Sequence, residues 1–219
     1  MEAIQRQMVT ADWMSLIVLL SLLCLVFAKA LSYNRFLNFL ILPFNNKYLI
    51  LNNKKGKLHS GFHISMSLFQ LMNLSLFGYF AILALVPAAS RWDGLFVFWM
   101  VLGGLLAFTL VKAGIQLLGG YLFEAQTAVS FLIFQKWSYF NYSSLCLFLA
   151  NLLLIYLWPQ AKALLFAGFI LMLVVNIIGA INILKMHQMF VSTRFFYFIL
   201  YLCALEIAPL LIIYNLVNA

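Results

Sequence analysis

Six long apolar stretches, joined by short segments that carry most of the charged residues, constrain this chain more than any other feature of its sequence. A hydrocarbon core about 30 Å thick needs about 20 apolar residues as a helix, because lipid offers no hydrogen-bond partner to the backbone. The composition, 66% hydrophobic and 8% charged, excludes a soluble fold of this size. We therefore expect an all-α, polytopic transmembrane helical bundle that forms a single domain over residues 1–219. The expected spans are Trp13–Leu31, Phe62–Val86, Gly94–Leu118, Ser143–Trp158, Ala163–Leu184 and Phe195–Val217.

Lysine and arginine residues fall mainly on one side of this span pattern. Because they are retained in cytoplasmic loops, while acidic residues count little, their distribution predicts the orientation. Ten lie in or beside the first, third and fifth connections: Lys29, Arg35, Lys47, Lys54, Lys55, Lys57, Lys112, Lys136, Lys185 and Arg194. Three lie on the other side: Arg6, Arg91 and Lys162. We expect both termini to lie outside the cytoplasm, which is the periplasm in a Gram-negative host, and the net charge of +8 to reflect topology rather than nucleic-acid binding.

Two connections are aromatic and amphipathic. The segment Ser32–Ile50 is interrupted at Pro43, which predicts a helix or hairpin that lies in the membrane interface. The segment Gly119–Tyr142 has the same character, with a re-entrant hairpin as the alternative. A basic turn follows the first of them and faces anionic lipid headgroups, through Lys54, Lys55 and Lys57. We expect interfacial anchoring from these segments, with a lipid-specific site as the alternative.

Glu206 is the one acidic residue inside an expected span, eleven residues from each end of the sixth. An ionised carboxylate near the middle of a bilayer costs about 2.5–3.5 kcal/mol, so we expect neighbouring helices to shelter it. Pro209 follows on the same helical face and frees a carbonyl near the carboxyl group. Two interpretations stay open: a proton relay or ligand contact, and an inter-helix hydrogen bond that locks the bundle.

Other polar residues recur at helical spacing within the expected spans. His63, Gln70 and Asn73 share one face of the second span, and Asn176 and Asn182 repeat the pattern in the fifth. Amide side chains in membranes hydrogen-bond between helices, so these faces should point into the bundle. Ordinary packing is the favoured interpretation, and a hydrated path is the alternative.

The third span offers two further features. Gly103 and Ala107 form a pair of small residues that would allow close helix approach. Lys112 lies near the cytoplasmic end of the span, where its side chain can reach the interface, with an ion pair as the alternative.

Motifs that would indicate catalysis are missing from the sequence. It has no phosphate-binding glycine loop, no GxSxG, no HExxH and no pair of intramembrane aspartates. His59 and His63 have the i, i+4 spacing of metal ligands, but no nearby acid completes the set. We expect no enzymatic activity, no cofactor and no metal ion.

The stretch FYFILYLCALEIAPLLII, residues 196–213, resembles the closing motif of a family of Bacteroidota integral membrane proteins that is classed as a domain of unknown function. An LCxLExxP pattern carries the resemblance, at Leu202, Cys203, Leu205, Glu206 and Pro209. The size of the chain and its basic first connection agree with that family over nearly the whole length. The resemblance implies an inner-membrane helical protein of the cell envelope, and it implies no catalytic residues.

Few residues lie outside the expected spans, so partners should be met within or on the bilayer. We expect these to be membrane lipids and other membrane or envelope proteins, with no nucleic acid. The expected function is that of a membrane-embedded subunit or accessory factor of a cell-envelope assembly. The alternative is a small transporter or proton-coupled channel that uses Glu206.

Overall fold

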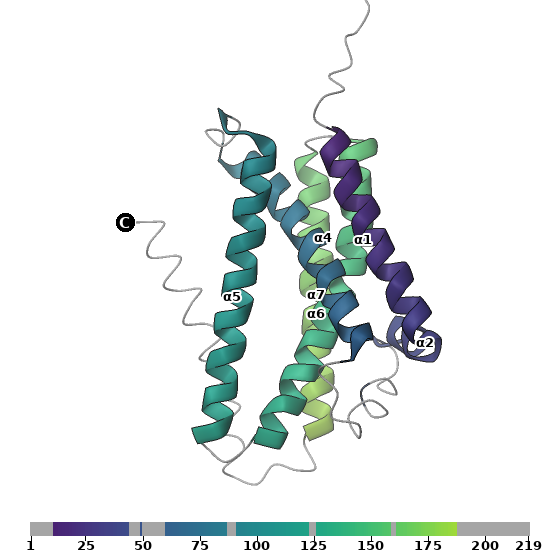
Figure 1. The fold of residues 1–219 in the computed structure, drawn as a ribbon, viewed down its shortest axis with the longest axis vertical. Helices are drawn as coiled ribbons and strands as arrows, with labels where there is room; N and C mark the ends of the chain where they lie inside the picture. Colours follow the sequence, from purple (N-terminus) through teal and green to yellow (C-terminus); the bar gives the residue numbers. More distant parts are fainter. Residues whose placement is uncertain are drawn as a thin grey trace, which may run out of the picture. The chain divides into compact units, whose positions relative to one another are not determined.

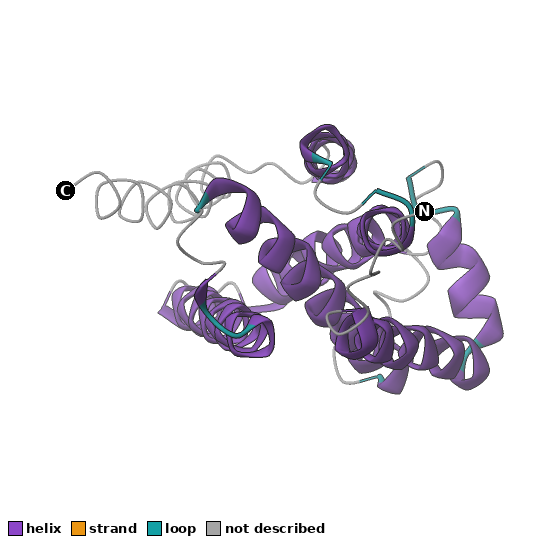
Figure 2. Cartoon of the chain, turned by 90° about the horizontal axis from the view of Figure 1, so that it is seen from above, coloured by secondary structure: helices purple, strands orange, loops and turns teal. Residues whose placement is uncertain are grey.

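The computed structural model describes residues 11–43, 49, 60–86, 91–122, 126–158 and 161–187, and the regular structure within them is helical throughout (Figure 1; Figure 2). The chain divides into two compact units, Met1–Ala180 and Ile181–Ala219. The first unit holds α1 (Ala11–Leu31), α2 (Tyr33–Leu40), α4 (Gly61–Leu85), α5 (Gly94–Leu122), α6 (Gln126–Tyr156) and most of α7 (Lys162–His187). The described part of the second unit is the end of α7.

Five helices are long and apolar enough to cross a membrane, and they coincide with the first five expected spans. Their span-like portions are Asp12–Leu31, Gly61–Leu85, Gly94–Leu118, Val129–Tyr156 and Lys162–Ile183. Such helices are consistent with a membrane-embedded protein. The sixth expected span, 195–217, lies outside the described residues, as do Glu206, Pro209, Lys54, Lys55 and Lys57.

Helix α6 differs from the expectation. The sequence suggested a short span from Ser143 and a separate interfacial or re-entrant segment over Gly119–Tyr142. In the structure one continuous helix runs from Gln126 to Tyr156, and α5 extends to Leu122. At 31 residues, α6 is about 46 Å long, more than the hydrocarbon core requires. Polar residues in its first half lowered its apparent hydropathy, although several are buried inside the bundle.

Proline and backbone capping explain where α6 stops. The N–H groups of Leu157 and Trp158 both donate to the carbonyl oxygen of Leu153, at 3.0 Å each. The second of these is the 6→1 bond of a helix C-cap. Pro159, next in the sequence, has no N–H to continue the ladder. Helix α6 therefore ends before Pro159, within two residues of the expected end of the span at Trp158.

The eight-residue helix α2 occupies part of the first amphipathic connection. It buries Phe36 and Phe39 and exposes Tyr33, Leu37 and Leu40 on its other side. The ring of Phe39 lies 6.0 Å from that of Phe62 on α4 and 5.7 Å from that of Tyr142 on α6, measured between centroids. Helix α2 therefore packs against the start of α4 and the middle of α6, and its place in the membrane interface stays a prediction.

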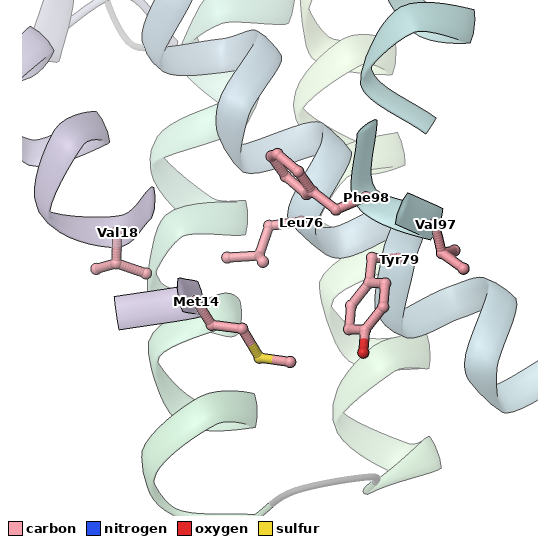
Figure 3. Packing of buried hydrophobic residues seen from close by; sticks show 6 residues of the cluster. All are labelled: Met14, Val18, Leu76, Tyr79, Val97 and Phe98. Carbon is pink, nitrogen blue, oxygen red and sulfur yellow. The ribbon is translucent and has the colours of Figure 1, made fainter. Parts of the chain in front are cut away.

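Two apolar clusters hold the long helices together. Where α1 and α5 begin and α4 ends, six buried side chains meet (Figure 3): Met14, Val18, Leu76, Tyr79, Val97 and Phe98. A second cluster joins α4, α6 and α7: Phe77, Leu147, Ala150, Leu154 and Leu165. Half of the membrane-span stretch of α6 is buried inside the bundle, against 11% of the corresponding stretch of α5. Helix α6 is therefore the innermost of the five, and α5 presents most of its surface outward.

Candidate functional site

Buried polar side chains gather on α4 and α6, where they form what we call the polar seam. Its α4 members are His63, Gln70 and Asn73, and its α6 members are Gln135, Asn141 and Asn151; none is more than 6% exposed. The three α4 residues lie seven and three positions apart, which places them on one helical face. This agrees with the expectation that this face points into the bundle.

At one end of the seam His63 meets Asn141. Nδ2 of Asn141 lies 3.4 Å from Nδ1 of His63, and the imidazole stands edge-on to the ring of Phe134, with centroids 4.8 Å apart. When Nδ1 accepts from the amide, the ring proton is on Nε2. Within the described part of the chain, Nε2 of His63 and Oδ1 of Asn141 are buried without a hydrogen-bond partner. This end of the seam therefore has spare hydrogen-bonding capacity.

Ten residues further along both helices, Asn151 meets Asn73. Nδ2 of Asn151 donates to the backbone oxygen of Asn73 at 2.9 Å and approaches its Oδ1 at 3.4 Å. Asn73 donates its own Nδ2 to the carbonyl oxygen of Phe69, at 2.9 Å. Oδ1 of Asn151 is buried and has no partner among the described residues. This contact ties an amide of α6 directly to the backbone of α4.

Both contacts join residues 78 positions apart, so α4 and α6 run parallel and in register. The same offset aligns identical residues of the two helices: Phe62 with Phe140, Ser65 with Ser143, Leu71 with Leu149, Asn73 with Asn151, Leu74 with Leu152, and Leu76 with Leu154. This likeness is local to the two helices. A homotypic asparagine pair at matched positions is a known way to fix the register of parallel helices.

Most other hydroxyl groups near the seam bond to their own helix. Ser75, Ser138 and Ser144 each donate to a carbonyl three or four residues earlier. Such local bonds use the hydroxyl hydrogen, so these side chains have no further hydrogen to donate to a ligand. Among the described residues no three His, Cys, Asp or Glu side chains come together. The seam can hold helices together, or bind a small polar molecule through its unpartnered atoms.

The remaining candidates that the structure describes lie elsewhere. Asn176 is half-buried on α7 and donates to the carbonyl oxygen of Met172 at 2.8 Å. Asn182, also on α7, and Lys112, on α5, are half-buried. Asn176, Asn182 and Lys112 do not belong to the polar seam.

Sequence reasoning missed the α6 half of the seam. Gln135 and Asn141 fell inside the segment interpreted as interfacial, and Asn151 was not singled out. The offset of 78, visible once α4 and α6 are aligned, was the signal that could have found them.

Helix α5 also corrects the sequence analysis. Gly103 and Ala107 were expected to allow close approach of a neighbouring helix, but both are exposed, and a Cβ added at Gly103 would meet none of the described residues within 4 Å. Met100 and Val111 lie on the same face and are exposed as well. We call these four residues the α5 stripe. The stripe is apolar, has small residues at its centre, and has no close neighbour at Gly103.

One family model, described as a domain of unknown function (DUF4271), matches residues 14–217, nearly the whole chain. No curated protein matches the chain, and no solved structure does.

Proposed function

The chain belongs to the DUF4271 family, whose description assigns no activity, and we propose that it serves as a membrane-embedded subunit or accessory factor of a cell-envelope assembly. The observation that carries this proposal is the outward-facing α5 stripe. Small residues spaced four apart let the backbones of two transmembrane helices approach closely. In this chain Gly103 and Ala107 have that spacing on the least buried span.

The other helices form a fixed framework, and the α5 stripe lies on its outer surface. Helices α4 and α6 are joined along their length by the polar seam and by the second apolar cluster. Helix α5 packs against this pair through Phe98, on the side away from the stripe, and through Val97 at its flank. A framework of this kind can dock a partner helix without rearranging its own core.

We further propose an inner-membrane location in a Bacteroidota cell envelope, with both termini periplasmic. The ten-to-three distribution of lysine and arginine supports the orientation. Membrane lipids and other envelope proteins are the proposed partners, and the proposed role involves no enzymatic step, cofactor or metal ion.

A matched pair of substitutions tests the role of the stripe. Ala107→Leu adds bulk at its centre, and Ala180→Leu adds the same bulk at an exposed position on α7. The tagged full chain is extracted in mild detergent, and copurifying membrane proteins are quantified by mass spectrometry. We expect Ala107→Leu to lower recovery of a specific partner about tenfold, a loss of about 1.4 kcal/mol, and Ala180→Leu to leave it unchanged.

Crosslinking identifies what covers the stripe. Gly103→Cys, in a chain whose native cysteines are replaced, is joined to its neighbours in the membrane with a short bifunctional reagent. A crosslink to another polypeptide, lost in the Ala107→Leu background, supports the proposal. A crosslink confined to residues 195–217 of the same chain would mean that its own last apolar stretch covers α5, and would contradict the proposal.

A small transporter or proton-coupled channel is the second candidate function. The three unpartnered buried atoms, Nε2 of His63 and Oδ1 of Asn141 and Asn151, favour it, because they could contact a polar solute or water. Its proposed carboxylate, Glu206, lies outside the described residues. Proton flux into liposomes that contain only this chain, abolished by Glu206→Gln, would support this candidate over a subunit role.

A further inference from the structure

An apolar groove of about 600 Å³ opens laterally between α1 and α4. Its α1 wall includes Leu20, Phe27 and Ala30, and its α4 wall includes Gly61, Leu68 and Met72. Phe27 is 59% exposed and Leu68 is 46% exposed, although both belong to span-like helices. The groove therefore faces whatever surrounds the bundle at this depth, which for a membrane-embedded helix pair is lipid.

The length of the groove matches one leaflet of a bilayer. On α4 it runs from Gly61, the first residue of the helix, to Met72, a distance of about 17 Å at 1.5 Å per residue. On α1 it runs from Leu20 to Ala30, about 15 Å, and stops one residue before the helix ends. Half of a hydrocarbon core is also about 15 Å thick. The groove thus extends from one membrane boundary to the middle of the bilayer.

The floor of the groove is almost entirely apolar, and its strongest hydrogen-bond donor is already used. Ser65 is its one hydroxyl-bearing lining residue, and its Oγ donates to the carbonyl oxygen of Cys24 at 2.6 Å. This bond crosses from α4 to α1 and satisfies the hydroxyl. An occupant inside the groove therefore gains from apolar contact alone, as a hydrocarbon chain does.

A positive charge lies at the depth of the open end of the groove, on another face of α1 than the lining. Lys29, in the last turn of α1, is exposed and immediately precedes Ala30 of the lining. Bases at a membrane boundary attract anionic headgroups.

We propose that this groove is a binding site for an anionic phospholipid of the leaflet at the α2 end of the bundle. One acyl chain lies between α1 and α4 from Ala30 and Gly61 to Leu20 and Met72, and the headgroup lies at the level of Lys29. The site is separate from the α5 stripe and does not depend on the function proposed above.

Two matched pairs of variants test the acyl and headgroup parts separately. Ile64→Trp fills the groove from an exposed lining position, and Ile170→Trp makes the same change at an exposed position on α7. Lys29→Gln removes the charge at the mouth, and Lys162→Gln removes an exposed charge at the opposite ends of the helices. The full chain is reconstituted in vesicles of phosphatidylglycerol and phosphatidylcholine, and retained lipid is measured by native mass spectrometry after mild detergent extraction.

We expect Ile64→Trp to lower retained phosphatidylglycerol at least fivefold and Ile170→Trp to change it by less than twofold. Lys29→Gln should lower the preference for phosphatidylglycerol over phosphatidylcholine about fivefold, and Lys162→Gln should leave it unchanged. Equal retention by Ile64→Trp and the unmodified chain would overturn the acyl site. Equal retention of the two lipids by the unmodified chain would overturn the anionic headgroup.

A measurement on the unmodified chain covers the case in which a variant fails to fold. Phosphatidylglycerol with a photoreactive group midway along its acyl chain is incorporated into the vesicles and activated. We expect labelled residues on the walls of the groove, such as Leu23, Phe27 and Leu68. Labelling confined to α5 and α7 would overturn the proposal. A protein segment crosslinked at Leu68→Cys would also overturn it, because the groove would then be covered by protein.

Discussion

Asn73 and Asn151 of the polar seam make their shortest hydrogen bonds to backbone rather than to each other. Nδ2 of Asn151 is 2.9 Å from the backbone oxygen of Asn73 and 3.4 Å from its side-chain oxygen. A side chain that bonds to a backbone atom keeps this partner when the side chain of the facing residue is replaced. The two asparagines are therefore unequal: Asn151 holds the helices together, and Asn73 mainly satisfies its own helix.

This inequality gives a prediction for Asn151→Ala. We expect it to lower the free energy of unfolding in detergent by about 1–2 kcal/mol, since a buried inter-helix bond and some packing are lost. Asn73→Ala leaves the 2.9 Å bond in place, so the coupling between the two substitutions should stay below about 0.5 kcal/mol. A thermal or denaturant double-mutant cycle measures it. Coupling above about 1.5 kcal/mol would mean that the side chains, not the backbone, carry the contact.

At the scale of helices, glycine marks where α7 meets α6. A Cβ added at Gly179 would lie 2.5 Å from Cγ and 2.8 Å from Cβ of Tyr139, which is fully buried on α6. Neither atom is the free end of a flexible side chain, so it cannot simply move aside. Gly103 on α5 offers the opposite case, with nothing within 4 Å. The same substitution at the two sites therefore separates helix packing from helix propensity.

We expect Gly179→Ala to destabilise the protein by about 1–3 kcal/mol through overpacking. Gly103→Ala should leave stability unchanged or raise it by up to about 1 kcal/mol, because alanine is the better helix former. Loss of folded protein on heating in detergent, followed by size-exclusion chromatography, compares the two. Equal stability of both variants would mean that α7 does not pack on α6 at Tyr139.

The helices themselves were largely predictable, and α6 shows where prediction from sequence fails. Four spans lie close to the expected bounds because each stays strongly apolar over its length, although single polar residues occur within them. In α6, which is the least apolar of the five, Gln135, Ser138 and Asn141 interrupt the run. A polar residue inside a membrane helix and one at the membrane surface look alike in a sequence. The structure distinguishes the two cases. Helix α4 runs parallel to α6, and the contact between His63 and Asn141 places Asn141 inside the bundle.

The same limit applies to the candidate sites. His63, Gln70 and Asn73 could be identified because their spacing matches a helical face. The outward position of Gly103 and Ala107 could not, because a pair of small residues has the same pattern whether it faces its own bundle or a partner. Which of these two directions the pair faces depends on how α5 packs against α4 and α6.

At the scale of the whole molecule, alternating helix direction places the loops on two sides. The start of α1, the end of α4, the start of α5 and the end of α6 share one side, as the hydrogen bond of 3.0 Å between Tyr156 and Ser15 and the cluster around Tyr79 indicate. Arg91 belongs to this side, and Lys29 and Arg35 belong to the other. The orientation of the chain can therefore be tested with two positions.

We expect Arg91→Cys to react with a membrane-impermeant thiol reagent from the periplasm, and Lys29→Cys to react only after the inner membrane is opened. Both are made in a chain without Cys24, Cys146 and Cys203, and labelling is read as a mass shift. The reverse pattern would invert the proposed topology. Labelling of both positions from one side would contradict the alternation of the helices.

The parallel pairing of α4 and α6 has a consequence for how the chain is made. The ribosome completes His63 and Asn73 before their partners, which lie 78 residues further on. At about 5–20 residues per second, translation leaves that interval open for roughly 4–16 s. During this time α4 enters the bilayer before its buried polar side chains can contact α6. Helix α5 must also cross the membrane, in the opposite direction, before α6 is made. The insertion machinery, or α1, has to shelter α4 in the nascent chain until then.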